Sequence, residues 1–471
     1  MYYRAVCSAF VFYIISINIL FGQAKLPDTP QGKIVQAYVD AFNSGDDGKI
    51  LAFFRENVSK EGLANRPAEA RLERTKMFRS NAKSLILLSV LNANETELSV
   101  TAKDVEGQVL TLTFGFDRKH KFDGMRVEMG NQPHESTPPM SAEGLLPSIE
   151  HYLTQRTSEN KFSGAVLVAR DTSIVFKKAY GEADKRFNIP NRIDTKFNIG
   201  SINKLFTRVA IGQLAEQGKL SLDKPLVTYL PEYPNPIVAR KVSINQLLSM
   251  TSGMGDFFGE KFDNAPKDKI RSLQDYLQFF VDDSLLFEPG SQRRYSNAGF
   301  IVLGLLVEKV SGQDYYSYMR DHVFLPAGMT NTDWYPMSGA TSNLATGYLP
   351  LGGSHEHWIS NIHMLPERGS SAGGGYSTLD DMLSFVYAVL NGKLLSPKYS
   401  EWLVTGDLPS TDPPIPLMHG GLANAGGTAG VNAVIHFEAE SKEVLVILSN
   451  YDPPSAEDAE RTIWSWMQKA K

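Results

Sequence analysis

Cysteine is almost missing from this sequence. Its only cysteine is Cys7, near the start of a chain of 471 residues. Disulfides need paired cysteines, and structural zinc sites usually need several of them, so the sequence excludes a disulfide framework and a cysteine-ligated metal. An oxidising compartment would therefore leave the chain chemically unchanged beyond that residue.

An excess of one charge is missing as well. The chain has 47 Lys and Arg against 52 Asp and Glu, for a formal net charge of −5, and the two signs are mixed along it. Nucleic-acid binding needs a basic stripe or face, which we do not find. The sequence also has no acidic tail, no internal repeat and no low-complexity segment.

Long apolar runs are confined to the N-terminus. Met1–Ala24 has Arg4 near its start, an apolar stretch from Ala5 to Leu20, and small residues at Gly22 and Ala24. This pattern predicts a cleavable secretory signal peptide, with an uncleaved membrane anchor as the alternative. No later run is long enough to cross a bilayer, so we expect a periplasmic or extracellular protein without a stable membrane span after cleavage.

The rest of the chain is expected to form two domains. Residues 25–130 predict a small α+β domain, 131–141 a polar, proline-containing linker, and 142–471 a larger domain. The first domain should begin with three amphipathic helices and continue with strands, which resembles the cone of nuclear-transport-factor-like domains. Its expected helices are Gly32–Phe42, Gly48–Phe54 and Ala68–Arg79. Asp123-Gly124 predicts a hairpin turn before a strand at Met125–Met129.

The larger domain is predicted to place strands at both of its ends. Alternating and apolar segments predict strands at Gly164–Arg170 and Ser173–Ala179, and again at Val431–Phe437 and Val444–Ser449, with a long helical middle. Strands separated in this way imply one antiparallel sheet assembled from distant sequence, flanked by helices and carrying a helical lobe. The active site should lie where the sheet meets the lobe.

One S-x-x-K motif combines a nucleophile with an activator. The spacing occurs four times, but only Ser201 and Lys204 lie at the start of a convincing helix, after Gly200 and before the stop at Gly218. A serine and a lysine three residues apart share one helical face, so an amine can lie beside a hydroxyl that must lose its proton. The helix dipole at this end also favours a developing alkoxide.

Tyr295-Ser296-Asn297 is the second motif that can carry chemistry. It stands between Pro289-Gly290 and a predicted helix at Phe300–Val310, so the phenol should lie at the mouth of that helix. A phenol titrates near ~10 and acts as a base at neutral pH only if a cation stabilises the phenolate. Lys204 is the candidate cation.

Together these motifs and three others resemble the class C β-lactamase-related serine hydrolases, a family of penicillin-binding-protein-like enzymes, esterases and D-amino-acid-specific peptidases. The matching blocks are Phe197–Lys204, Leu248–Met254, Tyr295–Phe300, Gly373–Thr378 and Leu448–Asn450. The resemblance implies the serine β-lactamase and penicillin-binding-protein fold, without metal or cofactor. It implies that Ser201 is acylated, that Lys204 and Tyr295 transfer protons, and that Asn297 orients the substrate and Lys204.

The third family motif departs from the usual K-T-G or H-x-G. Aligning the turn at Gly427–Asn432 places Asn424 where the family has lysine or histidine, whereas His419 would require a different register. The same alignment implies that the backbone N–H groups of Gly427 and Ser201 form an oxyanion hole. Because Asn424 carries no charge, we expect weak recognition of a β-lactam carboxylate.

The predicted function is a secreted or periplasmic serine hydrolase that acts through an acyl-enzyme on a small ester or peptide amide. The alternative is a non-catalytic, penicillin-binding-like protein that binds cell-wall material or a partner. A second candidate nucleophile, Ser371 in a G-x-S-x-G match, lacks the preceding strand that a nucleophile elbow needs. His355, His357 and His363 are expected in surface loops, without the spacing of a metal site.

Overall fold

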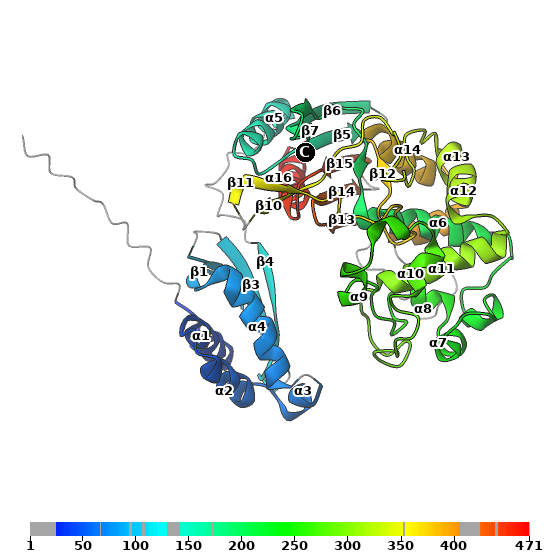
Figure 1. The fold of residues 1–471 in the computed structure, drawn as a ribbon. Helices are drawn as coiled ribbons and strands as arrows, with labels where there is room; N and C mark the ends of the chain where they lie inside the picture. Colours follow the sequence, from blue (N-terminus) through cyan, green and yellow to red (C-terminus); the bar gives the residue numbers. More distant parts are fainter. Residues whose placement is uncertain are drawn as a thin grey trace, which may run out of the picture. The chain divides into compact units, whose positions relative to one another are not determined.

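The structure is a computed structural model of the chain that describes two compact units, one up to Pro138 and one from Pro139 (Figure 1). The described residues are 25–470 except 66, 94–96, 106–108, 118, 130–141, 172, 352–353, 406–423 and 439–440. The predicted signal peptide, the predicted linker and His419 lie outside them. No described helix combines the length and apolarity needed to cross a membrane.

The N-terminal unit consists of helices followed by a four-stranded antiparallel sheet in the order β1-β2-β3-β4. The elements are α1 (Pro30–Asn43), α2 (Asp47–Asn57), α3 (Lys60–Asn65), α4 (Ala68–Ala82), β1 (Ile86–Ala93), β2 (Glu97–Lys103), β3 (Val109–Phe116) and β4 (Phe122–Met129). The three predicted helices are present, and α3 is an addition. Tyr38 lies at the centre of the core, with its ring 5.4 Å from Phe53 and 5.5 Å from Phe114.

The predicted hairpin turn at Asp123-Gly124 is wrong. Both residues lie inside β4, where Gly124 pairs with Gly115. The chain turns earlier, because the carboxylate of Asp117 accepts the backbone N–H groups of Lys119 and Lys121 at 2.8 and 2.9 Å. An aspartate side chain that accepts the N–H groups of the next few residues favours a turn, as Asp117 does here. Gly124 is instead paired with Gly115 in the neighbouring strand.

The C-terminal unit is built on a five-stranded antiparallel sheet in the order β13-β14-β15-β5-β6. Its strands are β5 (Gly164–Arg170), β6 (Ser173–Tyr180), β13 (Asn424–Thr428), β14 (Val431–Glu438) and β15 (Glu443–Ser449). The central pair joins β15 to β5, with Leu448 opposite Ala165. This confirms the prediction that strands from both ends of the domain form one sheet.

Both faces of this sheet are covered, which explains why its central strands are apolar at nearly every position. On β5, Val166 and Val168 contact one core cluster, with α5 (Ala142–Ser158) and α16 (Ser455–Lys469). Leu167 on the same strand faces the other cluster, with α6 (Asn203–Glu216) and α14 (Leu379–Leu390). The period of two along each strand therefore separates the two layers.

A helical lobe lies beside the sheet, with α6, α8, α10 and α11 close together in Figure 1. The helices of this region are α7 (Pro236–Lys241), α8 (Ile244–Leu248), α9 (Glu260–Asp263), α10 (Leu273–Leu277), α11 (Asn297–Ser311), α12 (Tyr315–Met319), α13 (Leu325–Ala327) and α15 (Pro397–Thr405). Short turns are η1 (Gly200–Ile202), η2 (Leu226–Thr228), η3 (Lys267–Lys269) and the π-helical η4 (Arg320–Phe324). The minor strands are β7 (Glu182–Asp184), β8 (Ile189–Pro190), β9 (Phe197–Asn198), β10 (Tyr348–Leu351), β11 (Ser354–Ser360) and β12 (Tyr376–Ser377).

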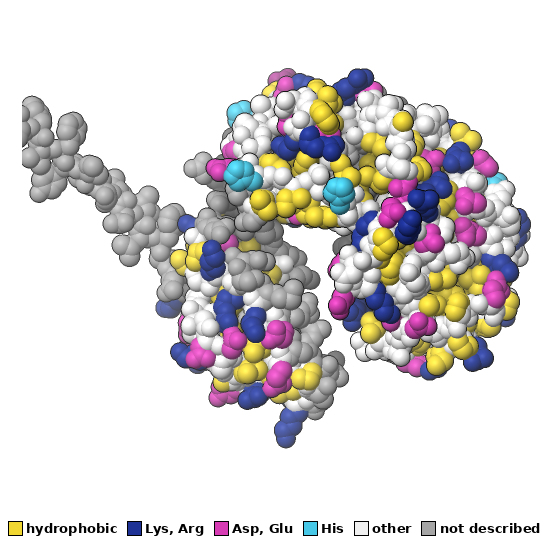
Figure 2. Space-filling view, viewed as in Figure 1, with side chains coloured by type: hydrophobic (Ala, Val, Ile, Leu, Met, Phe, Trp, Pro, Cys, Tyr) yellow, Lys and Arg dark blue, Asp and Glu magenta, His cyan; other side chains and the backbone are white. Residues whose placement is uncertain are grey.

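Side chains of both charges are interspersed over the face of the molecule seen in Figure 2, in agreement with the mixed charge of the sequence. His355 and His357 lie in β11, a strand rather than the predicted loop.

Candidate active site

Ser201 lies in the short turn η1, directly before α6. The turn is shaped by Gly200, whose φ of +49° suits glycine. The side chain of Asn198 accepts the Gly200 N–H at 2.9 Å, and buried Asn203 accepts the N–H of Gly375 at 2.6 Å. Local hydrogen bonds therefore fix the backbone on both sides of Ser201.

Two functional groups contact the hydroxyl of Ser201. Lys204 Nζ lies 3.1 Å from Ser201 Oγ, and the hydroxyl of Tyr295 donates to the same oxygen at 2.7 Å. Lys204 reaches it from the first turn of α6, and Tyr295 from just before α11. The structure thus brings together the three residues that the sequence predicted for catalysis.

Lys204 is buried, and loss of hydration disfavours its charged form. Burial lowers the pKa of Lys204 well below its ordinary value; Asp256 opposes this effect and the nearby Arg208 adds to it. The amine lies 2.7 Å from Asn297 Oδ1 and 2.5 Å from the carbonyl oxygen of Ala372. A neutral amine has two N–H donors and one lone pair. The two acceptors engage the donors, which leaves the lone pair for the hydroxyl proton of Ser201.

Asp256 is a functional residue that the sequence analysis missed. Its carboxylate accepts a hydrogen bond from Asn297 Nδ2 at 2.8 Å. Since a carboxylate only accepts, this contact turns the amide oxygen of Asn297 toward Lys204. Ser296 joins the loop that carries Asp256 to the start of α11, because its hydroxyl donates to the carbonyl oxygen of Gly255 at 2.7 Å. Asp256 follows the Leu248–Met254 block closely, and this proximity is the only sequence signal for it.

The proton-transfer role of Tyr295 stays a prediction, and its surroundings bear on whether the phenol is protonated. Burial is the main cause that raises the pKa of Tyr295, while the hydrogen bond with Ser201 lowers it less. The phenol therefore keeps its proton at neutral pH. Lys204 with a depressed pKa is also not the cation that a phenolate would need. The directions of the two pKa shifts favour Lys204 as the base and Tyr295 as a proton donor.

The strand β13 lies against the turn that carries Ser201. A Cβ atom on Gly426 would lie 2.2 Å from the carbonyl oxygen of Ile199 and 2.8 Å from the backbone nitrogen of Ser201. The Gly427 nitrogen in turn would lie 2.9 Å from a Cβ atom on Gly200. This contact brings the backbone of Gly427 next to the turn that carries Ser201, while its role at an oxyanion stays a prediction.

Asn424 is not among the described residues that line the cavity, so its role toward substrate stays a prediction. Residues of β13 that line the cavity are Ala425, Gly427 and Thr428. Successive residues of a strand face opposite sides, so Asn424 shares the face of buried Gly426. It pairs with Ile435 of β14 and is partly buried.

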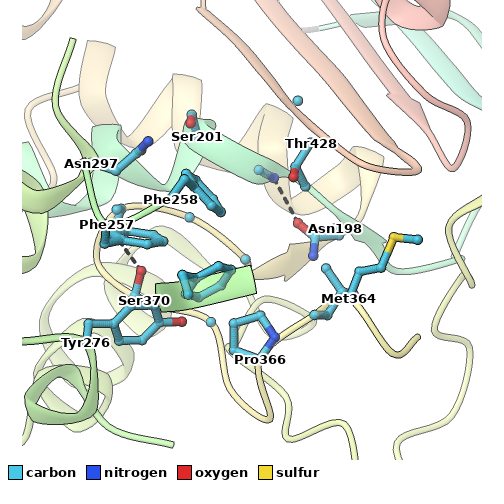
Figure 3. Close-up of a pocket in the computed structure, with 18 of the residues that line it drawn as sticks. Asn198, Ser201, Phe257, Phe258, Tyr276, Asn297, Met364, Pro366, Ser370 and Thr428 are labelled. Atoms are coloured by element: carbon cyan, nitrogen blue, oxygen red, sulfur yellow. Dashed lines mark hydrogen bonds between the residues drawn. The ribbon is translucent and has the colours of Figure 1, made fainter. Parts of the chain in front are cut away.

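A cavity of about 500 Å³ opens beside Ser201. Figure 3 shows Ser201 and Asn297 at one side of it, with aromatic rings and the side chains of Met364 and Pro366 around the same space. The apolar wall consists of Phe257, Phe258, Phe262, Tyr276, Met364, Leu365 and Pro366. An apolar cavity beside a nucleophile suits an organic acyl or alkyl group.

The G-x-S-x-G alternative does not fit the structure. Ser371 is fully buried, and its hydroxyl donates to the carbonyl oxygen of Phe300 at 2.8 Å. Its neighbour Ser370 lines the cavity, but Ser371 does not. Ser371 is thus a structural residue.

Comparison with known proteins agrees with this geometry. The β-lactamase family profile matches residues 149–465 of the chain. PbpX of Bacillus subtilis (strain 168), assigned by its name to the penicillin-binding proteins, is 30% identical over 304 residues, which cover 64% of this chain and 73% of that protein.

Two solved structures show the same fold. The penicillin-binding protein from Bacillus halodurans is 32% identical with a TM-score of 0.59, over 68% of this chain and 99% of that one. The D-amino acid amidase from Ochrobactrum anthropi SV3 is 20% identical with a TM-score of 0.59, over 69% and 99%. The C-terminal unit therefore has the serine β-lactamase and penicillin-binding-protein fold, and the chain belongs to the β-lactamase family.

Proposed function

We propose that this protein is a serine hydrolase that forms an acyl-enzyme on Ser201 and acts on a small ester or peptide amide. The observation that carries the proposal is the contact of the Ser201 hydroxyl with a buried amine of depressed pKa and with a protonated phenol. A nucleophile beside a neutral base and a proton donor is the arrangement that acyl transfer requires.

The first half of the reaction forms the acyl-enzyme. Ser201 Oγ bonds to the substrate carbonyl carbon as its proton passes to Lys204 Nζ. The carbonyl electron pair moves to the oxygen, which the backbone N–H groups of Ser201 and Gly427 stabilise. The bond to the leaving group then breaks, and the leaving group takes a proton from the hydroxyl of Tyr295, which recovers one from Lys204.

The second half returns the enzyme to its starting state. A water molecule bonds to the acyl carbon while its proton passes to Lys204. The bond from that carbon to Ser201 Oγ breaks, and Ser201 Oγ takes the proton from Lys204, which becomes neutral again as the acid product leaves. Asn297, held by Asp256, keeps the amine in place through both halves.

The proposed substrates follow from the cavity and from the relatives. The named activity of the amidase relative is hydrolysis of an amide, and the β-lactamase family acts on acyl compounds. The apolar wall of the cavity favours a neutral or apolar acyl group over a β-lactam carboxylate. We further propose that the N-terminal segment is a secretory signal, which would place the enzyme in the periplasm or outside the cell, and that the N-terminal unit is a cone-like domain.

Substitution of the nucleophile tests the proposal. Ser201→Ala is expected to reduce turnover of a chromogenic short-chain ester by about 10³-fold or more, with an unchanged thermal unfolding temperature. Ser221→Ala is the matched control, because Ser221 belongs to another S-x-x-K match but is exposed in a loop. A fluorophosphonate should label the peptide that contains Ser201.

Two outcomes would contradict the proposal. Full turnover by Ser201→Ala would remove Ser201 from the mechanism. A folded protein that forms no covalent adduct would instead support the alternative, a binding protein for cell-wall material or a partner, which the loss of the usual third-motif lysine favours.

A further inference from the structure

The wall of the cavity carries an acidic side chain without a basic counterpart. Among the described residues that line the cavity, Glu457 is the one carboxylate, and none is lysine, arginine or histidine. The one ionisable carboxyl group that a substrate meets in the described wall of this cavity is therefore that of Glu457.

Glu457 is held beside the strand that carries Gly427. It lies in the first turn of α16, whose start is fixed by Asn432 of β14: the Asn432 side-chain oxygen accepts the N–H of Ala456 at 2.6 Å and that of Glu457 at 3.4 Å. The preceding Pro453 also touches β13, since a Cβ atom on Gly427 would lie 2.7 Å from its ring. The carboxylate is thus attached to the rigid part of the site.

The negative charge of Glu457 is only weakly compensated. Arg461, one turn further along α16, forms its ion pair with Asp458, which also pairs with Arg156 at 3.2 Å. Glu457 Oε2 is buried and has no hydrogen-bond partner among the described residues. Burial is the largest cause of the raised pKa of Glu457, whereas a hydrogen bond with the side chain of Asn432 and the charge of Arg461 act in the opposite direction. A weakly compensated carboxylate beside a cavity favours a ligand that brings its own cation or donor.

We propose that Glu457 selects substrates that carry an ammonium group on the arm lying against β13 and α16. This inference rests on the proposed hydrolase function and names the substrate class of the same site. A primary or quaternary ammonium gains a charge-assisted contact with the carboxylate, whereas a carboxylate at that position meets a like charge. The opposite wall, with Phe257, Phe258 and Phe262, receives the uncharged arm of the ester or amide.

Matched esters test this selection. Two series are needed, one with the variable group in the acyl part and one with it in the alcohol, each with a trimethylammonium, a tert-butyl and a carboxylate end. We expect a preference in the one series whose variable group lies against β13 and α16. There the unaltered protein should show a kcat/KM for the ammonium ester about fivefold above that for the tert-butyl isostere and about tenfold or more above that for the carboxylate. Glu457→Gln should remove this order.

A second acidic residue of α16 provides the control. Glu460 pairs with His436 at 2.7 Å and does not line the cavity, so Glu460→Gln should keep the order of the unaltered protein. The preference of the unaltered protein should also shrink as salt rises, which needs no variant.

Binding separates this inference from the proposed function. Calorimetric titration of Ser201→Ala with the same compounds measures charge preference without turnover, and the double variant with Glu457→Gln should lose it. Equal binding of ammonium and tert-butyl compounds in both series, or an order that persists after Glu457→Gln, would overturn the role of Glu457. Absence of turnover with preserved ammonium selectivity would contradict the hydrolase function alone.

Discussion

Lys204 shows how a single side chain acquires its chemistry from its neighbours. Its amine is buried, so the charged form loses hydration, and its two acceptors leave the lone pair for Ser201. Arg208 lies one turn further along α6, and burial lowers its own pKa to about 10. Burial of two basic groups near each other destabilises their charged forms. This effect lies at the site where a neutral lysine can act as a base.

The charge of Asp256 should set the acidic limb of the pH profile. Lys204 must be neutral to accept a proton, so kcat/KM should rise with pH through the pKa of Lys204. Asp256 raises that pKa because its negative charge favours the ammonium form. Asp256→Asn removes the charge, lowers the pKa of Lys204 further, and should move the acidic limb to lower pH. The pH dependence of kcat/KM for a neutral ester measures this shift.

Asp256→Ala is the companion variant. It also frees the amide of Asn297 to turn, so we expect kcat to fall by about 10- to 100-fold from misplacement of the amine. An acidic limb that stays in place in Asp256→Asn, or moves to higher pH, would contradict the electrostatic role of Asp256.

At the scale of elements, the site depends on how closely β13 approaches η1. Gly426→Ala would place a methyl group 2.2 Å from the carbonyl oxygen of Ile199, where only backbone movement can relieve the contact. We expect the free energy of unfolding to fall by about 1 to 3 kcal/mol and ester turnover to be lost. Urea unfolding and fluorophosphonate labelling measure the two effects.

A glycine in an open strand position gives the comparison. A Cβ atom on Gly124 would have no neighbour within 4 Å, so Gly124→Ala should leave both stability and turnover nearly unchanged. Full activity of Gly426→Ala would mean that the oxyanion strand tolerates displacement and that Gly427 is not needed.

Elements whose pattern is complete within a short stretch of sequence could be predicted. The register of Ser201 and Lys204 is set within one helical turn, and the strands of the large sheet show runs of apolar residues. Asp256 could not be predicted, because its contact with Asn297 joins a loop to a helix start 41 residues later. The role of Asn424 stays a prediction, since motif alignment fixes neither the face of a strand nor the residues that line a cavity.

At the scale of the molecule, the two units have separate cores. The core cluster of the N-terminal unit draws its buried residues from Val35 to Phe122, and the clusters of the C-terminal unit begin at Leu145. The cone-like fold predicted for the first unit stays a prediction, because the family match begins at residue 149.

Separate cores predict independent folding. A chain of residues 139–471 should fold alone and hydrolyse the short-chain ester within about threefold of the full chain, because a unit with its own hydrophobic core can fold by itself. Calorimetry of the full chain should show two unfolding transitions, one of which the shorter chain retains. A shorter chain that is insoluble or inactive would show that the catalytic unit needs the first one.

The C-terminal unit pairs elements from the start of its sequence with elements from its end, so it cannot be completed until late in synthesis. These helices begin and end the C-terminal unit, and they join through Arg156 and Asp458 and through the rings of Tyr152 and Trp466, 5.6 Å apart. The ribosome makes β5 early, but its neighbour β15 emerges only after the whole helical lobe. The serine is thus made long before β13, the strand proposed to stabilise its oxyanion, so a nascent chain carries the proposed nucleophile before the sheet beside it can form.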